Sequence, residues 1–295
     1  MKKLIFEGCA TALVTPMFAD GSINENAFRK LVDEQIEKGV DALVVCGTTG
    51  ESSTLDHKEH TLAIKIVVEQ AAGRVPVIAG TGSNDTNYAV KLCKEAVELG
   101  ADALLMVTPY YNKTSQAGLI AHYTYVADRV DAPIIVYNVP SRTGVNIKPE
   151  TYKELAKHPN IVAAKEANGD ISSVLKTVSL CGDELTIYSG NDDQTVPIMA
   201  LGGKGIISVA SNVIPTEMHQ LTDACLKGDF KKATELSVKY SDLMDGMFMD
   251  VNPIPVKEAM NMMGMEMGEC RLPLVSMSDA QKAKLKEILK SAKVI

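Results

Sequence analysis

The chain has 295 residues, of which 46% are hydrophobic and 23% are charged, and its formal net charge at pH 7 is -7. Such a composition indicates a globular protein with a sizeable core, and the negative balance argues against nucleic acid or an anionic membrane as a partner. No apolar run reaches the roughly 18 residues of a membrane span, and Glu7 ends the apolar start of the chain too early for a signal peptide.

Short apolar runs alternate with amphipathic stretches along most of the chain. The runs have the length of strands and most lack polar alternation, which is typical of strands covered on both faces. They occupy residues 10–14, 42–46, 75–79, 103–107, 133–137, 161–165, 185–188 and 205–209. The stretches between them include helical patterns at 25–38, 56–71 and 86–99. Glycines at 39, 73 and 100 follow these patterns and suit helix C-caps.

Eight strands joined by helical crossovers predict a (β/α)8 TIM barrel, an α/β fold. A doubly wound open sheet is the alternative, but it normally has fewer strands and often carries a nucleotide-binding fingerprint, which this sequence does not show. After residue 209 the pattern becomes helical, with expected helices at 216–227, 230–249, 255–263 and 278–291. We therefore expect a catalytic barrel over residues 1–224 and a C-terminal helical domain over residues 225–295.

In such a barrel the functional side chains follow the carboxyl ends of the strands. Lys165 closes one of these apolar strands, and burial of an amine there disfavours the ammonium form and lowers its pKa. A pKa near about 7 or 8 leaves a useful fraction of neutral amine, which is nucleophilic toward a ketone. The alternative is a lysine that pairs with Glu166 or extends to solvent at the end of the strand.

Three other features at this end of the barrel fit a small carbonyl acid, although each has an ordinary structural explanation. Tyr137 ends the neighbouring strand and could act as a phenolic acid or base, but buried core tyrosines are common. The glycine-flanked Thr48 and Thr49 offer hydroxyl and main-chain N–H groups to a carboxylate, but such residues also form plain loops. Arg142 could bind a carboxylate with two hydrogen bonds or could form a surface ion pair.

Other chemistry-bearing residues fit structural roles better. His57 and His60 stand three apart on a predicted helix without a third ligand at suitable spacing, so we expect no metal site. Asp192 and Asp193 are expected to begin a helix, where carboxylates complement the helix dipole. The glycine-rich run 202–205 lacks the spacing of a P-loop. The six scattered cysteines form no CxxC pair, which indicates reduced thiols and a cytoplasmic protein.

Seven segments carry motifs that are recognisable together: residues 47–52, 110–112, 137–144, 165–167, 189–192, 205–209 and 252–257. In combination they resemble the dihydrodipicolinate synthase (4-hydroxy-tetrahydrodipicolinate synthase) family, within the N-acetylneuraminate lyase superfamily of pyruvate-dependent class I aldolases. The resemblance extends nearly from end to end. It implies a lyase that condenses pyruvate with L-aspartate 4-semialdehyde to 4-hydroxy-tetrahydrodipicolinate, the first committed step of diaminopimelate and lysine biosynthesis.

The resemblance also implies a role for each matching residue. Lys165 would form an imine with pyruvate, with no other cofactor and no metal, and Tyr137, Thr49 and Tyr111 would form a proton relay. The implied substrate-binding residues are Thr48, Thr49, Arg142, Ile207 and Gly190. Arg142 would bind the carboxylate of the semialdehyde. Tyr111 would reach into the site of a neighbouring subunit, which implies a homodimer or a dimer of dimers.

A regulatory lysine site at the dimer interface is implied by the same resemblance. The matching residues are Ser52, Ser53, His57, His60, Asn84, Tyr88 and Tyr110. Tyr88 stands where a carboxylate is expected to pair with the lysine ammonium, and without that partner the charge is poorly compensated. We therefore predict weak or absent inhibition by lysine.

Two other functions stay open from the sequence. A sibling enzyme, such as N-acetylneuraminate lyase or a keto-deoxy-sugar aldolase, would use the same Lys165 and Tyr137. Arg142 and the double threonine favour a small dicarboxylate-like product over a sugar, which calls for hydroxyl-binding groups. A non-catalytic barrel that serves as a binding protein would be expected to lack the lysine or the tyrosine, and both are present.

Overall fold

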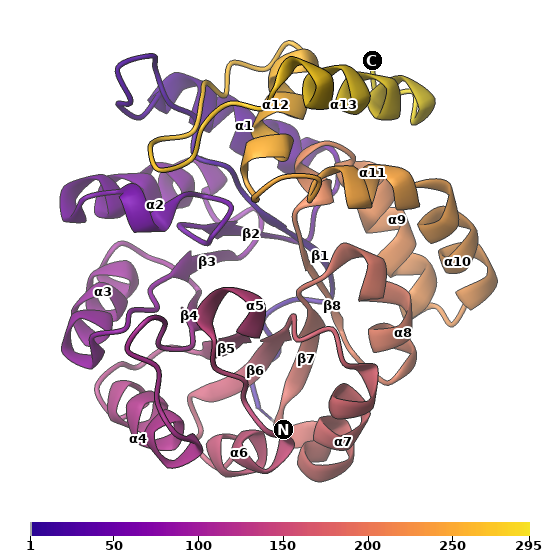
Figure 1. Ribbon diagram of the computed structural model, residues 1–295. Coiled ribbons are helices and arrows are strands. Elements are labelled where there is room, and N and C mark those ends of the chain that lie inside the picture. Colours follow the sequence, from indigo (N-terminus) through magenta and orange to yellow (C-terminus); the bar gives the residue numbers. More distant parts are fainter. Residues whose placement is uncertain (1) are drawn as a thin grey trace.

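The computed structural model, which describes residues 2–295, is a closed barrel of eight parallel strands (Figure 1). The strands follow one another around the barrel in chain order, and the last pairs with the first. They are β1 (Gly8–Ala12), β2 (Ala42–Val45), β3 (Val77–Gly80), β4 (Ala103–Val107), β5 (Ile134–Asn138), β6 (Ile161–Glu166), β7 (Thr186–Ser189) and β8 (Gly205–Ser208). The predicted TIM barrel is confirmed, and every predicted run overlaps one of these strands.

Helices surround the barrel and continue beyond it. The α-helices are α1 (Glu25–Glu37), α2 (His57–Ala71), α3 (Thr86–Glu98), α4 (Gln116–Ala127), α5 (Pro140–Thr143), α6 (Pro149–Leu155), α7 (Ile171–Cys181), α8 (Thr195–Ala200), α9 (Pro215–Leu226), α10 (Phe230–Lys239), α11 (Ser241–Gly246), α12 (Ile254–Met262) and α13 (Asp279–Ser291). Four short 3-10 helices are η1 (Ser52–Thr54), η2 (Gly182–Glu184), η3 (Asp192–Gln194) and η4 (Ala210–Asn212). The glycines expected after α1, α2 and α3 have positive φ angles, as helix ends of this kind require.

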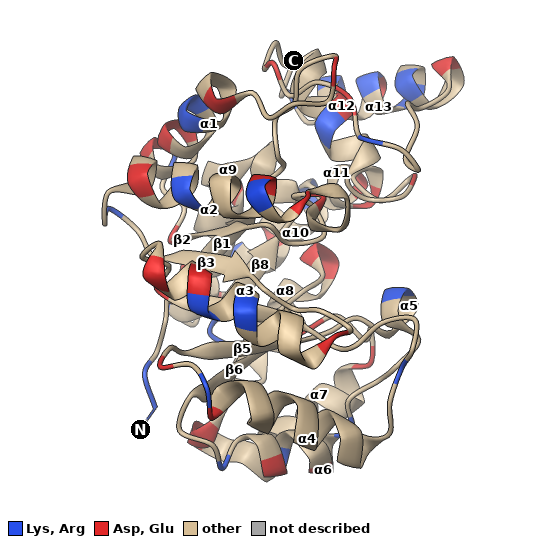
Figure 2. Ribbon diagram, turned by 90° about the vertical axis from the view of Figure 1, so that its left-hand side faces the viewer, with Lys and Arg blue, Asp and Glu red and all other residues tan. Residues whose placement is uncertain are grey.

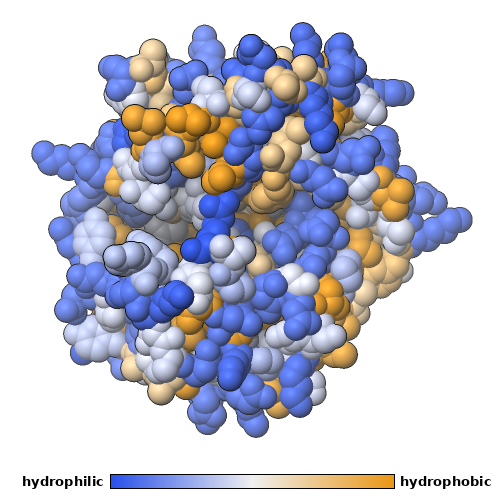
Figure 3. Space-filling view, in the orientation of Figure 1, coloured by the Kyte–Doolittle hydropathy of each residue, from blue (hydrophilic) through white to orange (hydrophobic). Residues whose placement is uncertain are grey.

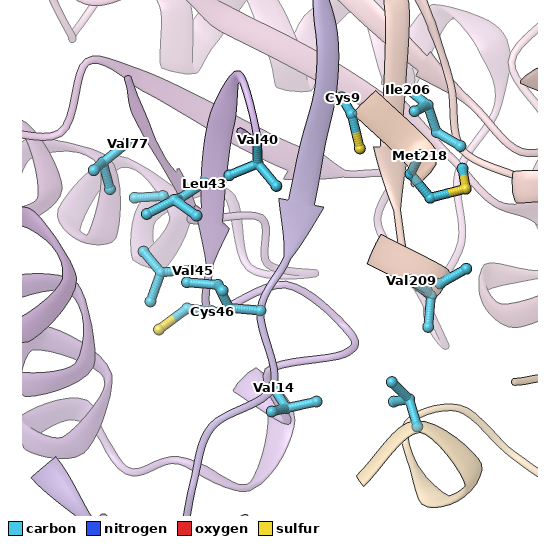
Figure 4. Packing of buried hydrophobic residues seen from close by; sticks show 14 of the residues in the cluster. Cys9, Val14, Val40, Leu43, Val45, Cys46, Val77, Ile206, Val209 and Met218 are labelled. Carbon is cyan, nitrogen blue, oxygen red and sulfur yellow. The ribbon is translucent and has the colours of Figure 1, made fainter. Parts of the chain in front are cut away.

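Two apolar layers hold the fold together. The outer layer lies between the strands and the helices, and Figure 4 shows part of it, with Cys9 of β1, Ile206 of β8 and Met218 of α9 close to one another. The inner layer fills the barrel. There Phe6, just before β1, stacks on Tyr188 of β7 with ring centres 4.2 Å apart. This packing fills the barrel interior below the carboxyl ends of the strands.

The C-terminal extension, from α10 to α13, packs along one side of the barrel (Figure 1, orange to yellow). The single helix predicted at 230–249 is wrong, because the chain leaves the helical conformation at Tyr240, where φ is -107°. The turn lets α10 pack on α9 while α11 packs on α13 and η3. The predicted division between residues 224 and 225 falls within α9 and stays a prediction.

Charged residues lie mainly on the helices and loops, whereas most strand residues are uncharged (Figure 2). Hydrophilic residues also cover most of the face seen in Figure 3, with hydrophobic residues in scattered patches. Within residues 2–295, no helix combines the length and the apolar character needed to cross a membrane. The apolar residues of this chain are therefore used largely in the two core layers.

Candidate active site

A cavity of about 190 Å³ lies at the carboxyl ends of the strands. Among its lining residues are six that the sequence predicted: Thr48, Thr49, Tyr137, Arg142, Lys165 and Gly190. These six come from the ends of β2, β5, β6 and β7 or from the loops that follow. The expectation that they would meet at one end of the barrel is confirmed. Residues that the sequence reasoning did not select, Asn191, Val209, Phe248 and Asn252, also line the cavity.

Lys165 is buried in this cavity, with only 5% of its surface exposed. Burial lowers its pKa to about 7, an effect that nearby Asp192 opposes and Arg142 reinforces. A lysine with this pKa is about half neutral at pH 7, whereas an ordinary lysine is almost wholly protonated. Lys165 is therefore suited to attack a carbonyl carbon.

The alternative that Lys165 pairs with Glu166 is not what the structure shows. Successive residues of a strand point to opposite faces, so Glu166 points away from the barrel interior. There its carboxylate accepts hydrogen bonds from Asn138 Nδ2 at 2.9 Å and from the Tyr152 hydroxyl at 2.8 Å. Burial raises the pKa of Glu166 to about 7, although these two hydrogen bonds act to lower it. The Glu166 carboxylate therefore links β6 to Asn138 of β5 on the outer face of the barrel.

Tyr137 is the direct neighbour of Lys165 in the sheet, because β5 and β6 pair these two residues. The Lys165 Nζ atom lies 4.4 Å from the centre of the phenol ring. Burial raises the pKa of Tyr137, while Arg142 and a hydrogen bond with Thr48 act to lower it. The phenol is therefore protonated at neutral pH and can donate a proton or a hydrogen bond beside the amine.

Gly190 is needed where the end of β7 passes Lys165. A Cβ atom at this position would lie 2.8 Å from Ala167 Cβ and 3.2 Å from Lys165 Cε. Any larger residue would therefore push against the lysine stem. The sequence predicted Gly190 as a substrate-binding residue, and the structure shows that its lack of a side chain also makes room for the amine.

Asn252, between α11 and α12, connects two of the predicted residues from across the cavity. Its Nδ2 donates to Thr49 Oγ1 at 3.1 Å, and its main-chain oxygen accepts from Arg142 Nη2 at 3.2 Å. The C-terminal extension therefore contributes directly to the site. In the chain, Asn252 comes long after the last barrel strand, so the strand-end rule did not select it, although the motif at 252–257 was among those recognised.

The turn that carries Thr48 and Thr49 is anchored by a buried ion pair. Lys257 Nζ of α12 lies 2.9 Å from Glu51 Oε1, and both side chains are 2% exposed. The other carboxylate oxygen of Glu51 accepts from the main-chain N–H of Arg271 at 2.9 Å. Glu51 itself has a left-handed backbone, with φ of 55°. The turn is thus fixed by the C-terminal extension rather than by the barrel alone.

Asp192 begins η3, as expected, but its carboxylate does more than complement a helix end. It is buried and accepts hydrogen bonds from Ser208 Oγ at 2.5 Å and from the main-chain N–H groups of Val209 and Ala210 at 3.2 and 3.1 Å. Burial raises its pKa, and the charge of Lys165 acts to lower it. Asp192 follows β7 closely, so the strand-end rule could have selected it.

Two predicted residues do not line this cavity. Tyr111 is 91% exposed on the loop after β4, with a left-handed backbone at φ of 69°. The side chain of Ile207 is fully buried inside the barrel, and Val209, two residues later, lines the cavity instead. The contact of Tyr111 with a neighbouring subunit stays a prediction.

A second cavity of about 430 Å³ adjoins the first and shares Thr48, Tyr137 and Arg142 with it. It brings together five residues of the predicted regulatory site: Ser52, Ser53, His60, Tyr88 and Tyr110. His57 does not line this cavity but contacts Tyr88, whose hydroxyl is 3.4 Å from His57 Nδ1. Asn84 lines a separate cavity. Within residues 2–295 no group of three or more His, Cys, Asp or Glu could hold a metal ion.

Comparison with known proteins identifies the relatives of this fold and site. The model of the dihydrodipicolinate synthetase family matches residues 5–292. The 4-hydroxy-tetrahydrodipicolinate synthase of Thermoanaerobacter sp. strain X514 is 52% identical over 286 residues, which cover 97% of this chain and 96% of that protein.

Solved structures give the same result. The crystal structure of dihydrodipicolinate synthase from Aquifex aeolicus has a TM-score of 0.96 at 46% identity, over 98% of this chain and 99% of that one. The chloride-inhibited enzyme from Acinetobacter baumannii, complexed with pyruvate, has a TM-score of 0.97 at 42% identity, over 99% of this chain and 100% of that one.

Proposed function

The chain belongs to the dihydrodipicolinate synthetase family, and we propose that it condenses pyruvate with L-aspartate 4-semialdehyde through an imine on Lys165. The product is 4-hydroxy-tetrahydrodipicolinate, the first committed intermediate of diaminopimelate and lysine biosynthesis. The observation that carries this proposal is a buried amine with a pKa of about 7 beside a protonated phenol in a small cavity. The relatives named above support the choice of substrates.

The first step joins the amine to pyruvate. The neutral Nζ of Lys165 attacks the keto carbon, the carbonyl oxygen takes up a proton, and loss of water gives the imine. The Tyr137 phenol, 4.4 Å from Nζ measured to its ring centre, is placed to supply and recover these protons. The pyruvate carboxylate is held by the main-chain N–H groups and hydroxyls of the turn at Thr48 and Thr49.

The second step forms the new carbon–carbon bond. Loss of a proton from the methyl group of the protonated imine gives an enamine, because the imine nitrogen accepts the electron pair. The enamine carbon then attacks the aldehyde, whose oxygen takes up a proton from the relay of Tyr137 and Thr49. Attack of the substrate amino group on the imine carbon then closes the ring and releases Lys165. The imine nitrogen serves as electron sink, so the proposal requires no metal or organic cofactor.

Arg142 is the residue proposed to bind the carboxylate of the semialdehyde. It lines the cavity beside Tyr137, and its Nη2 is held by the main-chain oxygen of Asn252. A guanidinium group can form two parallel hydrogen bonds with a carboxylate, which orients the substrate as well as binding it. The positive charge of Arg142 also acts to lower the pKa of Lys165, which favours the nucleophilic form of the amine.

A homodimer, alone or paired into a tetramer, is part of this proposal. Tyr111 is 91% exposed and lies on the loop after β4, at the same end of the barrel as the cavity, so its ring is free to contact a second chain. In a dimer, this ring would enter the site of the partner chain and complete its proton relay. The predicted cytoplasmic location stays a prediction.

Weak or absent inhibition by lysine is also proposed. Tyr88 lines the second cavity and presents a phenol where an ammonium group would need a carboxylate. Burial raises the pKa of Tyr88, and neighbouring Glu95 adds to the rise, so the hydroxyl is uncharged at neutral pH. Half-inhibition by submillimolar lysine would contradict this part of the proposal.

A coupled assay tests the function. Pyruvate and aspartate 4-semialdehyde are supplied together with a reductase that consumes the product, and NADPH oxidation is followed for the wild type and for Lys165→Ala. Turnover that disappears in the variant supports both the reaction and its nucleophile. A wild type without turnover that still forms a borohydride-trapped pyruvate adduct on Lys165 would indicate a sibling aldolase with another aldehyde substrate.

A further inference from the structure

The side-chain amide of Asn252 is only half satisfied by hydrogen bonds. Its Nδ2 donates to Thr49 Oγ1, whereas Oδ1 is buried and has no hydrogen-bond partner among the residues that the structure describes. A buried carbonyl oxygen without a donor is costly, and such oxygens in folded proteins usually have a partner. A group that binds beside Asn252 can supply the missing donor.

The position of Asn252 limits what this donor can be. The residue is 5% exposed and lines the same cavity as Lys165 and Tyr137. Its main-chain oxygen accepts from Arg142, and its Nδ2 donates to Thr49, so the main chain and the side chain of Asn252 are each held by one hydrogen bond. Oδ1 is buried, and because Asn252 lines the cavity, a group bound there is a nearby source of the missing donor.

The two substrates differ in the hydrogen-bonding groups that they can offer to Asn252. Pyruvate offers a carboxylate and a carbonyl group, both of which accept hydrogen bonds and cannot satisfy another acceptor. Aspartate 4-semialdehyde also carries an amino group, which is a donor and needs an acceptor in the site. No Asp or Glu lines this cavity within residues 2–295, so an amide oxygen is a suitable acceptor for that group.

The spacing of the binding groups agrees with the shape of the semialdehyde. Its carboxylate and its amino group are bonded to one carbon atom, so the residues that bind them must be neighbours. Arg142, the proposed carboxylate ligand, lies within hydrogen-bond distance of Asn252, with Nη2 3.2 Å from the main-chain oxygen.

We infer that Asn252 Oδ1 accepts a hydrogen bond from the amino group of the aldehyde substrate and thereby selects α-amino aldehydes. This inference rests on the proposed function and adds a specificity residue to it. With Arg142 on the carboxylate and Asn252 on the amino group, the site recognises both substituents of one carbon. The C-terminal extension then contributes to substrate choice, whereas the imine chemistry belongs to the barrel.

Two variants and a substrate analogue test the inference. Succinate semialdehyde has the same aldehyde and carboxylate but no amino group, and it is used as a competitor of aspartate 4-semialdehyde. Asn252→Ala is expected to raise the KM for aspartate 4-semialdehyde about tenfold or more, as loss of a hydrogen bond to a charged group does. The lost hydrogen bond to Thr49 affects both aldehydes, so the deciding quantity is the ratio of the KM for aspartate 4-semialdehyde to the inhibition constant of succinate semialdehyde, which should rise about tenfold.

Asn252→Asp is the matched control. Aspartate keeps the acceptor oxygen and can still accept a hydrogen bond from the Thr49 hydroxyl, so it should restore the KM for aspartate 4-semialdehyde to within about threefold of the wild type. A loss as large as that of Asn252→Ala would overturn the inference, because it would mean that the amide nitrogen faces the substrate.

The remaining outcomes are also decisive. If Asn252→Ala weakens succinate semialdehyde as much as aspartate 4-semialdehyde, Asn252 only positions Thr49 and Arg142, and the inference fails. If the wild type turns over aspartate 4-semialdehyde and Asn252→Ala has the same KM for it, the inference fails and the proposed function stands. Absence of any turnover of this aldehyde by the wild type overturns the proposed function together with it.

Discussion

Lys165 and Tyr137 occupy paired positions on β6 and β5, and the lysine Nζ atom lies 4.4 Å from the centre of the tyrosine ring. The amine, with its pKa lowered to about 7 by burial, and the protonated phenol are therefore fixed by the hydrogen bonds of the sheet. Behind them, Glu166 joins the same two strands from the outer face through Asn138 and Tyr152. The pair does not depend on a flexible loop.

The pH dependence of imine formation should report the lowered pKa of Lys165. The rate of borohydride-trapped pyruvate adduct formation is expected to rise as pH increases through about 7 and then to level off, because only the neutral amine attacks. Asp192 acts to raise this pKa, so Asp192→Asn should move the midpoint to lower pH. Asp193→Asn, which changes an exposed carboxylate next to it, is the control and should leave the midpoint in place. A rate that keeps rising toward pH 10 would contradict the assignment.

Removal of the Tyr137 hydroxyl should slow the reaction without preventing formation of the pyruvate adduct. Tyr137→Phe is expected to lower kcat by roughly 100-fold or more, as loss of a general acid–base group does. The pyruvate adduct should still form on Lys165, and mass spectrometry after reduction would detect it. Tyr123→Phe removes another buried hydroxyl, bonded to Met106 outside this cavity, and should leave kcat near the wild-type value. Equal losses in both variants would point to a general effect on the barrel.

Tyr111 can be tested by complementation between chains. Lys165→Ala and Tyr111→Ala should each be almost inactive alone. When they are co-expressed, a mixed dimer has one site with Lys165 from one chain and Tyr111 from the other, so about a quarter of wild-type activity should return with random pairing. Lys165→Ala with Tyr137→Phe is the control, because both residues serve the site of their own chain. Failure of the first pair to recover would show that Tyr111 does not cross between subunits.

The buried pair Glu51–Lys257 should be costly to break from one side. Lys257→Met leaves the Glu51 carboxylate buried without its partner, and we expect a loss of about 3–5 kcal/mol in the free energy of unfolding. Denaturant unfolding measures this loss, and the KM for pyruvate should rise as well, because the turn at Thr48 and Thr49 loses its anchor. Lys227→Met breaks an exposed pair with Asp223 and should cost less than about 1 kcal/mol.

Sensitivity to lysine should appear when a carboxylate is placed at position 88. Tyr88→Glu supplies the charge partner that an ammonium group needs in the second cavity, and inhibition by lysine is expected to strengthen markedly over the wild type. Steady-state rates at increasing lysine measure the effect. Tyr125→Glu, at a similarly exposed tyrosine outside that cavity, should behave as the wild type. Strong inhibition of the wild type itself would show that the phenol is no obstacle.

Much of the barrel and its site could be predicted because the signals are local. Apolar runs of strand length marked all eight strands, and the strand-end rule selected Lys165 and Tyr137 from residue type and position alone. Asp192 was interpreted only as a helix start, since the sequence does not reveal that Ser208 and the N–H groups after β8 meet its carboxylate.

The contributions of the C-terminal extension could not be predicted in the same way. The contact of Asn252 with Thr49 and the pair of Lys257 with Glu51 join residues about 200 positions apart in the chain. No periodic pattern encodes such a distance. The helix expected at 230–249 failed for a related reason, because its break at Tyr240 follows from packing on two different partners, α9 and α13.

The anchoring of the Thr48–Thr49 turn by Lys257 and Arg271 has a consequence for the order of events during synthesis. On a ribosome, all eight strands emerge before the segment that locks the turn, so a nascent barrel can close while it is still inactive. Activity then begins only when the last part of the chain has docked. Removal of the segment from α12 to α13 would take away both Lys257 and Arg271, and the turn at Thr48 and Thr49 would lose its anchor.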